Sequence, residues 1–298
     1  MSEPLSSICP KRGAMPDTAF LFEPSRHKPL PDGDASIPRS VFTYHIPPPP
    51  LSEFVDRFWF YRCDASVRVR ERALPAGTME LVVDLRHDGR SSLVYGAHSE
   101  PYVVDAADAV SSVGVHFKPG GAFLFLNVPA GELHNTHVSL DSLWGSRSDA
   151  LRERLLEAET PAAKFRVLEQ ALLAQTVRPP ARHPAVAFAL EEFRRGARAP
   201  TVGDVTDRVG LGARTFIRLF AEEVGLTPKL FCRIRRFQQV LRLARSGQPV
   251  EWATIALDCG YYDQAHLIHD FRAFSGFTPT AFLQVWGRHL DYGARWTR

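Results

Sequence analysis

The 298-residue sequence predicts an α+β N-terminal domain, a small β-barrel or sandwich plus helices, followed by an all-α C-terminal domain built from a repeated pair of helices. Three observations predict this fold class. Short β-rich runs separated by turn residues fill the stretch 70–126, helical periodicity begins near residue 140, and a two-helix pattern recurs after residue 200. At roughly 100–200 residues per domain, the length suits about two domains.

The N-terminal domain is expected over residues 41–177. Residues 1–40 are rich in Pro, Ser and charge and show no periodicity, so we predict a disordered extension there. The runs MELVVDL, SLVYGA and SSVGVHF read as strands, because the turn signals PAG, DGR, HSEP and KPGG separate them. Apolar residues at helical spacing then fill 151–177, with Pro161 predicted to start the second of two helices.

A linker and a change of charge follow. The segment RPPARHP (178–184) carries three prolines and is the predicted linker to a domain over 185–298. The net charge of +3 hides unequal halves, since residues 1–180 hold 19 Lys and Arg against 22 Asp and Glu, whereas 181–298 hold 17 against 11. A basic half indicates a surface that faces phosphate, or else a chance surface bias.

Cysteine spacing argues against a zinc-ribbon or thioredoxin-type protein, and hydropathy argues against a membrane or secreted protein. Cys9, Cys63, Cys232 and Cys259 stand far apart with no CxxC pair, so neither a zinc ribbon nor a thioredoxin-type site is encoded. No apolar run approaches the ~20 residues of a membrane span, and the N-terminus lacks the apolar segment of a secretory signal. We therefore expect a cytoplasmic protein with no membrane partner.

Residues 201–224 predict a helix-turn-helix unit. Thr201 is the expected N-cap, and Gly210 permits the tight turn between the helices. Val205 and Phe216 lie on the faces expected to pack together, whereas the arginines of the second helix lie on the opposite face. A short exposed helix with arginines suits the DNA major groove, although a plain helical hairpin is the alternative.

A second unit over residues 252–275 repeats the pattern. Gly260 makes its turn and Asp263 is a suitable N-cap. The segments GLTPKLF and GFTPTAF follow the two second helices, and Phe220 and Phe271 are 51 residues apart. This offset indicates internal duplication.

These residues resemble the AraC/XylS family of transcriptional regulators. RTFIRLFAEEVGLTPKLFCRIRRFQQVLRLA and IALDCGYYDQAHLIHDFRAFSGFTPTAF carry the resemblance, which spans about residues 183–287. It implies two helix-turn-helix units joined by a linker helix at about 229–246. It also implies recognition helices at 212–224 and 263–275 in the major groove. Gly212, Thr206 and Ile217 depart from the Ser, Ala and polar residue usual in the family.

The resemblance and the helical faces together give the predicted DNA-binding residues. Arginine suits guanine edges or phosphates, glutamine suits adenine, and isoleucine suits a thymine methyl group. Arginines 233, 235, 236 and 242 crowd the linker helix, where some are expected near phosphate and others in intramolecular ion pairs. The predicted DNA-binding residues are Ala213, Arg214, Ile217, Arg218, Gln264, Ala265, Ile268, His269 and Arg272.

The N-terminal half resembles a domain often attached to this family, where it is thought to sense a signal or control dimerisation. Trp59, Tyr61 and Tyr95 are candidates to line a pocket for a small apolar ligand, or else they are simply core. His116, His134 and His137 suggest a metal site on a cupin-like barrel. The HxH…E…H spacing of metal cupins is missing, so we expect no metal and no cofactor.

We therefore predict a sequence-specific DNA-binding transcription regulator that is not an enzyme. The sequence contains no GxSxG, HExxH or paired-carboxylate pattern. The expected partners are double-stranded DNA, RNA polymerase if the protein is an activator, a small-molecule effector and a second copy in a homodimer. The alternatives are an interaction protein with a degenerate helix-turn-helix domain and a small-molecule enzyme on a cupin-like N-terminal domain.

Overall fold

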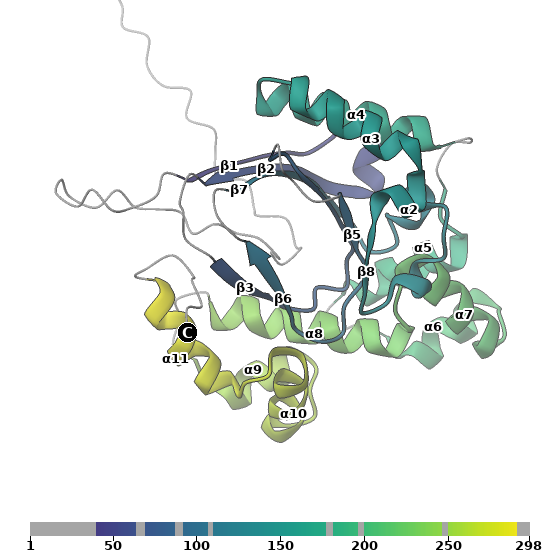
Figure 1. The fold of residues 1–298 in the computed structure, drawn as a ribbon. Coiled ribbons are helices and arrows are strands. Elements are labelled where there is room, and N and C mark those ends of the chain that lie inside the picture. The colour runs from purple at the N-terminus through teal and green to yellow at the C-terminus, as the bar shows by residue number, and fades with distance from the viewer. Residues whose placement is uncertain are drawn as a thin grey trace, which may run out of the picture.

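A computed structural model describes most of the chain after residue 39 (Figure 1). The predicted extension over 1–40 lies outside the described residues except for Ser40, and the predicted linker over 178–184 lies partly outside them. The described ranges are 40–63, 69–86, 92–106, 110–176, 181–195, 200–245 and 250–290.

The N-terminal part is built on antiparallel strands, as the sequence predicts. A six-stranded sheet has the order β1-β2-β7-β4-β5-β8, and a two-stranded ribbon pairs β3 with β6. Figure 1 shows the sheet strongly curved, with the ribbon between it and helix α8. The strands are β1 Ser40–His45, β2 Val55–Cys63, β3 Val69–Ala73, β4 Glu80–Asp84, β5 Leu93–Tyr95, β6 Tyr102–Ala106, β7 Val110–Phe117 and β8 His137–Ser139.

The central strand β7 is buried on both faces, since residues 112–117 are all buried. Val113, Val115 and Phe117 of β7 are fully buried. Gly114 lies between them where the Trp59 ring crosses the strand, and a Cβ there would stand 2.4 Å from that ring. Glycine is required at this position because the ring occupies the space of a side chain.

Helices cover the outer side of this sheet. Helix α4 packs on β1 and β2, and the ring of Phe165 stacks near those of His45 and Phe58. Thr160 caps α4 and Pro161 starts it, which confirms the predicted helix start. The N-terminal helices are η1 Leu51–Glu53, α1 Phe123–Leu126, η2 Ala130–Leu133, α2 Leu140–Trp144, α3 Ser146–Glu157 and α4 Pro161–Gln175.

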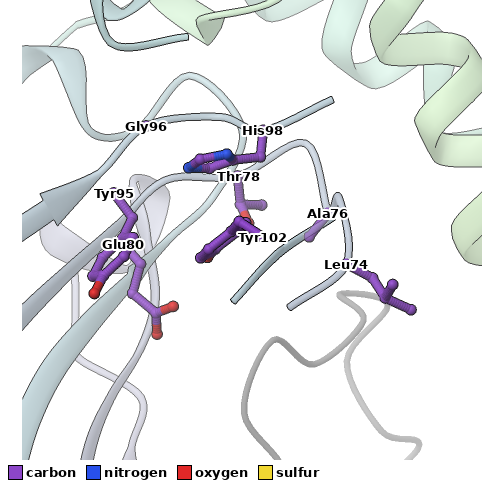
Figure 2. A pocket seen from close by; sticks show the side chains of 8 residues that line it. All are labelled: Leu74, Ala76, Thr78, Glu80, Tyr95, Gly96, His98 and Tyr102. Carbon is purple, nitrogen blue, oxygen red and sulfur yellow. The ribbon is translucent and has the colours of Figure 1, made fainter. Parts of the chain in front are cut away.

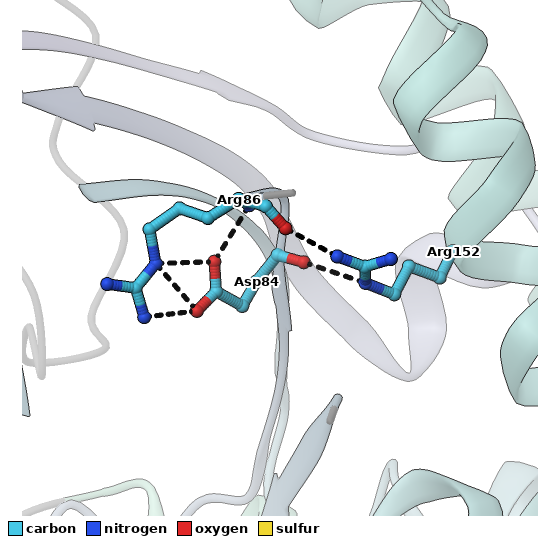
Figure 3. A network of polar contacts seen from close by, with 3 residues as sticks. All are labelled: Asp84, Arg86 and Arg152. Atoms are coloured by element: carbon cyan, nitrogen blue, oxygen red, sulfur yellow. Dashed lines mark hydrogen bonds and ion pairs between the residues drawn. The ribbon is translucent and has the colours of Figure 1, made fainter. Parts of the chain in front are cut away.

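A polar network ties α3 to the end of β4 (Figure 3). The Arg152 guanidinium donates to the backbone oxygens of Asp84, at 3.2 Å, and Arg86. The Arg86 side chain in turn forms an ion pair with the Asp84 carboxylate, its Nε lying 3.0 Å from both oxygens. These bonds satisfy backbone carbonyls where the strand ends.

The C-terminal part is all helical, which confirms the predicted fold class. Helix α8 joins two helix pairs, α6–α7 and α9–α10. Aromatic side chains form the core of the C-terminal part. Around the first pair these are Phe193, Phe220 and Phe231, and around the second pair they are Phe237, Phe271 and Phe274. The helices are α5 Pro184–Phe193, α6 Val202–Val209, α7 Ala213–Val224, α8 Pro228–Ala244, α9 Trp252–Asp258, α10 Gln264–Ser275 and α11 Pro279–Leu290.

The apolar core is continuous between the two parts. Gly225 follows α7, and a Cβ there would lie 3.2 Å from Ala97 and from the backbone oxygen of Ala130. Buried residues of the sheet and of the C-terminal helices belong to one cluster. None of the helices in the described ranges has the length and hydropathy to cross a bilayer.

Candidate nucleic-acid interface

The first helix pair has the geometry of a helix-turn-helix unit. Thr201 caps α6 in a reciprocal capping box with Asp204, which confirms the predicted cap. Gly210 ends α6 at φ +68°, a conformation that favours glycine. Val205 and Phe216 are fully buried between the helices. Gly212 caps α7 without a side-chain hydrogen bond, so the amide groups at the start of α7 lack a side-chain oxygen.

The outer face of α7 carries the residues predicted to contact DNA. Ala213, Arg214, Ile217 and Arg218 are all exposed. Ile217 is 41% exposed, so its side chain is accessible on this face. The Arg218 guanidinium forms an ion pair of 2.6 Å with Glu222, one turn further along the helix. This carboxylate competes with any phosphate for Arg218.

The second helix pair presents a matching face. Asp263 caps α10 by accepting a hydrogen bond of 2.7 Å from the His266 amide, as the sequence predicts. Most of the predicted contacts lie exposed on α10, and one is half-buried. Gln264, Ala265, His269 and Arg272 are exposed, and Ile268 is half-buried.

Sequence reasoning missed Tyr262. Its side chain is 87% exposed in the turn before α10, whereas that of its neighbour Tyr261 is 4% exposed. The two consecutive tyrosines after Gly260 could have indicated an exposed ring, because only one of the two rings fits beneath the turn. A phenol at this exposed position before α10 can donate a hydrogen bond to a phosphate.

The arginines of α8 hold the second unit together. Arg233 donates to the buried Asp270 carboxylate of α10 at 2.7 Å and covers the Phe274 ring. Arg236 lies over the Tyr261 ring, 5.1 Å from its centre. The expected intramolecular ion pair on the linker helix is thus formed by Arg233.

We predict that Glu222→Gln strengthens DNA binding about two- to fivefold, because an exposed ion pair of ~0.2–1 kcal/mol no longer holds Arg218 and a negative charge leaves the surface. Fluorescence anisotropy with labelled DNA measures the change. Glu153→Gln on α3 removes an exposed carboxylate far from α7 in sequence and is the control. Unchanged or weaker binding by the Glu222 variant would contradict this prediction.

One segment of the N-terminal part contacts the helices of the second unit. Arg72 donates to the backbone oxygen of Ser275 at 3.1 Å, at the end of α10, and covers the Phe277 ring. The Gln238 amide of α8 donates to the backbone oxygen of Pro75. A Cβ on Gly77 would lie 3.3 Å from the Phe231 ring of α8. Residues 72–77 therefore fit closely against the linker helix.

The first unit is held by the N-terminal part as well. Helix α7 packs on η2. Arg182 donates to the backbone oxygens of Gly120 and Glu53, both at 3.0 Å, and covers the Phe54 ring. The next residue, His183, donates its amide to the Glu223 carboxylate of α7 at 3.0 Å. The chain entering the C-terminal helices is thus fixed to both parts.

A small hollow opens beside the segment that contacts α8 (Figure 2). Polar and aromatic side chains dominate its wall. The ring centres of His98 and Tyr102 are 4.0 Å apart, and those of Tyr95 and Tyr102 are 5.7 Å apart. The lining residues are Leu74, Ala76, Thr78, Glu80, Tyr95, Gly96, His98 and Tyr102.

Of the three residues predicted to line a pocket, one lines the hollow and two do not. Tyr95 lines the hollow. Trp59 is buried and does not line the hollow, and its indole nitrogen donates to the Glu80 carboxylate at 2.7 Å. Tyr61 is half-buried on β2 and does not line the hollow. Glu80, His98 and Tyr102 were missed because they come from three separate strands or turns.

The three histidines considered for a metal site have separate partners. His116 lies 3.9 Å from the Glu80 carboxylate, His134 hydrogen-bonds Ser99 at 3.1 Å, and His137 packs on Tyr95. Within the described ranges, no three His, Cys, Asp or Glu side chains are grouped as metal ligands.

We predict that the stability of the protein depends on pH because of the buried side chain of His98. Burial, with smaller contributions from His137 and His134, lowers its pKa from 6.5 to about 4. Between those values the unfolded chain binds a proton that the folded chain does not, so stability falls with falling pH by about 2–3 kcal/mol. Urea unfolding at pH 7 and pH 4.5 measures the loss. His98→Gln should reduce the pH slope, and an equal slope in both proteins would contradict this cause.

The comparisons with known proteins match two segments. Residues 205–284 match the model described as "Helix-turn-helix domain", and residues 43–139 match a "Domain of unknown function (DUF6597)". No curated protein matches the chain.

Solved structures with similarity to the chain include DNA-binding regulators. A probable AraC family regulator from Rhodopseudomonas palustris is 26% identical, and the match covers 34% of this chain and 96% of that one with a TM-score of 0.31. The DNA-binding domain of AdpA, in complex with a target DNA, is 22% identical over 37% of this chain and 98% of that one, with a TM-score of 0.34. ToxT from Vibrio cholerae, bound to (E)-4-(8-methylnaphthalen-1-yl)but-3-enoic acid, is 9% identical over 76% and 97%, with a TM-score of 0.41.

The assignment of the C-terminal domain rests on the repeated unit and on the family model. The two helix pairs joined by α8 have the arrangement that the sequence signature implies, and the helix-turn-helix model covers both of them. Residues 205–284 are therefore a helix-turn-helix domain of the AraC type.

Proposed function

We propose that the protein binds specific operators by placing α7 and α10 in successive major grooves, and that its N-terminal part senses a signal or mediates dimerisation. One observation carries the DNA-binding proposal. Residues 51 positions apart occupy the same places on the two helices, and each pair includes an exposed side chain. The pairs are Ala213 with Gln264, Arg214 with Ala265, Ile217 with Ile268 and Arg218 with His269.

The two helices offer different side chains for contact with DNA. On α7, Arg214 and Arg218 offer guanidinium groups for guanine edges or phosphates. On α10, Gln264 offers the amide that pairs with adenine, and His269 offers a ring nitrogen. The first unit is therefore proposed to favour G·C pairs and the second to favour an adenine.

Regulation is proposed to run through the contacts between the two parts. Residues 72–77 contact α8 and the end of α10, while η2 contacts α7. A signal that shifts this segment would change the relative placement of the two recognition helices. The proposed partners also include RNA polymerase, if the protein is an activator, and a second copy in a homodimer. The proposal places the protein in the cytoplasm, where it can reach DNA.

Salt dependence of DNA binding tests the proposal against a degenerate interaction domain. The full chain is titrated with random-sequence duplex at 50 and 200 mM salt. Contact with 6–10 phosphates predicts a loss of affinity of about 10³–10⁵-fold. Arg218→Ala and His269→Ala should each weaken binding, whereas Arg166→Ala on the exposed face of α4 should not. Absence of binding at low salt, or binding that salt does not change, would refute the proposal.

A further inference from the structure

Helices α7 and α10 end in the same way. Each is followed by a glycine of positive φ, Gly225 at +85° and Gly276 at +79°. The amide of Gly225 donates to the backbone oxygen of Ala221, and that of Gly276 donates to the backbone oxygen of Arg272. The two glycines are 51 residues apart, which is the offset of the internal duplication. The ends of the two helices are therefore equivalent positions in the repeated unit.

The N-terminal part packs closely on the end of α7. A Cβ on Gly225 would lie 3.2 Å from the backbone oxygen of Ala130 and 3.2 Å from the Cβ of Ala97. A Cβ on Gly131 of η2 would lie 3.1 Å from the backbone oxygen of Ala221. Backbone therefore meets backbone at this contact, and packed backbone yields less than a flexible side chain does.

Arg72 makes the corresponding contact at the end of α10. Its guanidinium donates to the backbone oxygen of Ser275 at 3.1 Å and lies 5.2 Å from the centre of the Phe277 ring. A Cβ on Gly276 would lie 3.1 Å from the same guanidinium. The last carbonyl groups of a helix carry partial negative charge, which favours a cation at this position. Arg72 thus holds α10 at its last turn.

These contacts connect α7 to α10 by a second route. Helix α8 is the first connection, with 17 residues and a length of about 25 Å, and Figure 1 shows α7 and α10 apart from each other along it. On the second route, the chain runs from Arg72 into β4, which pairs with β5, and Ala97 lies just after β5. The N-terminal part therefore contacts the equivalent ends of both helices.

We propose that the N-terminal part fixes the spacing between the two DNA segments that the protein reads, because it holds α7 and α10 at these ends. Arg72 is a positioning residue, which acts through α10 and not by contact with DNA. The proposal rests on the proposed function, since it requires both helices to read DNA.

The geometry of DNA makes such a constraint selective. One added base pair moves a DNA segment by about 3.4 Å along the axis and rotates it by roughly 34°. To follow that segment, α10 would have to move by a similar amount relative to α7. This movement would break the hydrogen bond of Arg72 or separate η2 from α7. Without the Arg72 contact, movement of the second unit costs fewer contacts.

Binding to duplexes of altered spacing tests the proposal. The duplex that the unaltered full chain selects from a random pool is compared with duplexes one base pair longer and one base pair shorter between its two conserved segments. We expect the unaltered chain to bind the altered duplexes about 10- to 100-fold more weakly, because one helix loses its base contacts. Arg72→Met removes the donor and keeps an apolar side chain beside Phe277, so its three affinities should agree within about threefold.

Two further variants accompany this measurement. Arg166→Met removes an exposed arginine of α4 and is the matched control, which should keep the full spacing preference. Gly131→Val places a branched side chain against the Ala221 backbone oxygen at the other contact, so it should also reduce the preference. Circular dichroism establishes that each variant is folded, and Gly131→Val decides the test if Arg72→Met is not. An equal loss of affinity for all three duplexes in the Arg72 variant would show an effect of charge alone and would overturn the proposal.

Amide hydrogen exchange without DNA separates this proposal from the proposed function. Arg72→Met should speed exchange in residues 272–276, at the end of α10, by about threefold or more and leave α6 unchanged. Unchanged exchange at the end of α10, or full spacing preference in either folded variant, would overturn the proposal. A chain that binds no duplex refutes the proposed function and this inference with it. A two-segment motif whose spacing preference survives Arg72→Met refutes the inference alone.

Discussion

Arg233→Met is expected to lower the free energy of unfolding by about 3–5 kcal/mol, since it leaves a buried carboxylate without its cation. The Asp270 side chain is 2% exposed, and one of its oxygens accepts two hydrogen bonds from the Arg233 guanidinium. Its other oxygen has no partner among the described residues. The methionine cannot supply either bond, so the charge of α10 stays buried and uncompensated.

A double-mutant cycle separates the ion pair from simple packing. Asp270→Leu should cost less than Arg233→Met, because the Arg233 side chain is 31% exposed and can reach water. Replacing both residues by Leu and Met should recover most of the stability, since the buried charge is gone. Urea unfolding measures each variant, with Arg166→Met as the surface control. Additive losses in the double variant would show that the pair does not couple α8 to α10.

Arg214→Ala and Gln264→Ala are expected to relax sequence preference, each at a different part of the operator, by about 1–3 kcal/mol. Both side chains lie on exposed helix faces, so neither change should alter folding. The two sites lie in separate units, and their losses should add in the double variant to about 30- to 3 × 10⁴-fold.

Competition between the selected operator and single-base variants measures this effect. The expected result is that each variant loses discrimination at one position and keeps it elsewhere. A uniform loss of affinity over all sequences would instead mean that the residue contacts phosphate. Arg166→Ala removes an exposed arginine of α4 and should leave both affinity and preference unchanged.

The sequence predicted the C-terminal helices closely because local signals mark their ends. Thr201 and Asp263 are capping residues, Gly210 adopts a positive φ, and the linker helix predicted at about 229–246 spans Pro228–Ala244. Such signals act within one turn of the chain and require no knowledge of distant contacts.

The strands β1, β3, β6 and β8 were not predicted individually. The β3 sequence VRERA is mostly charged, and β1 begins at Ser40, the last residue of the stretch predicted to be a disordered extension. They form strands because their partners are present in the fold: β3 pairs with β6, and β1 pairs with β2. Pairing between segments far apart in sequence overrides weak local preference.

The contacts between the N-terminal and C-terminal parts also could not be predicted from sequence patterns. Arg72 and Ser275 are 203 residues apart, and neither belongs to a motif. The hollow likewise combines residues 74–80 with 95–102. Periodicity places Tyr95 and Glu80 on strands, but only the sheet register places them opposite each other.

Selection of bound duplexes from a random pool by the full chain tests the central claim most directly, namely that α7 and α10 both read DNA. Two recognition helices on one face of DNA predict a motif with two conserved segments about one helical turn, ~10 base pairs, apart. Arg214→Ala should erase preference in one segment and Gln264→Ala in the other. A single short conserved segment, or a motif that both variants leave intact, would contradict reading by two helices.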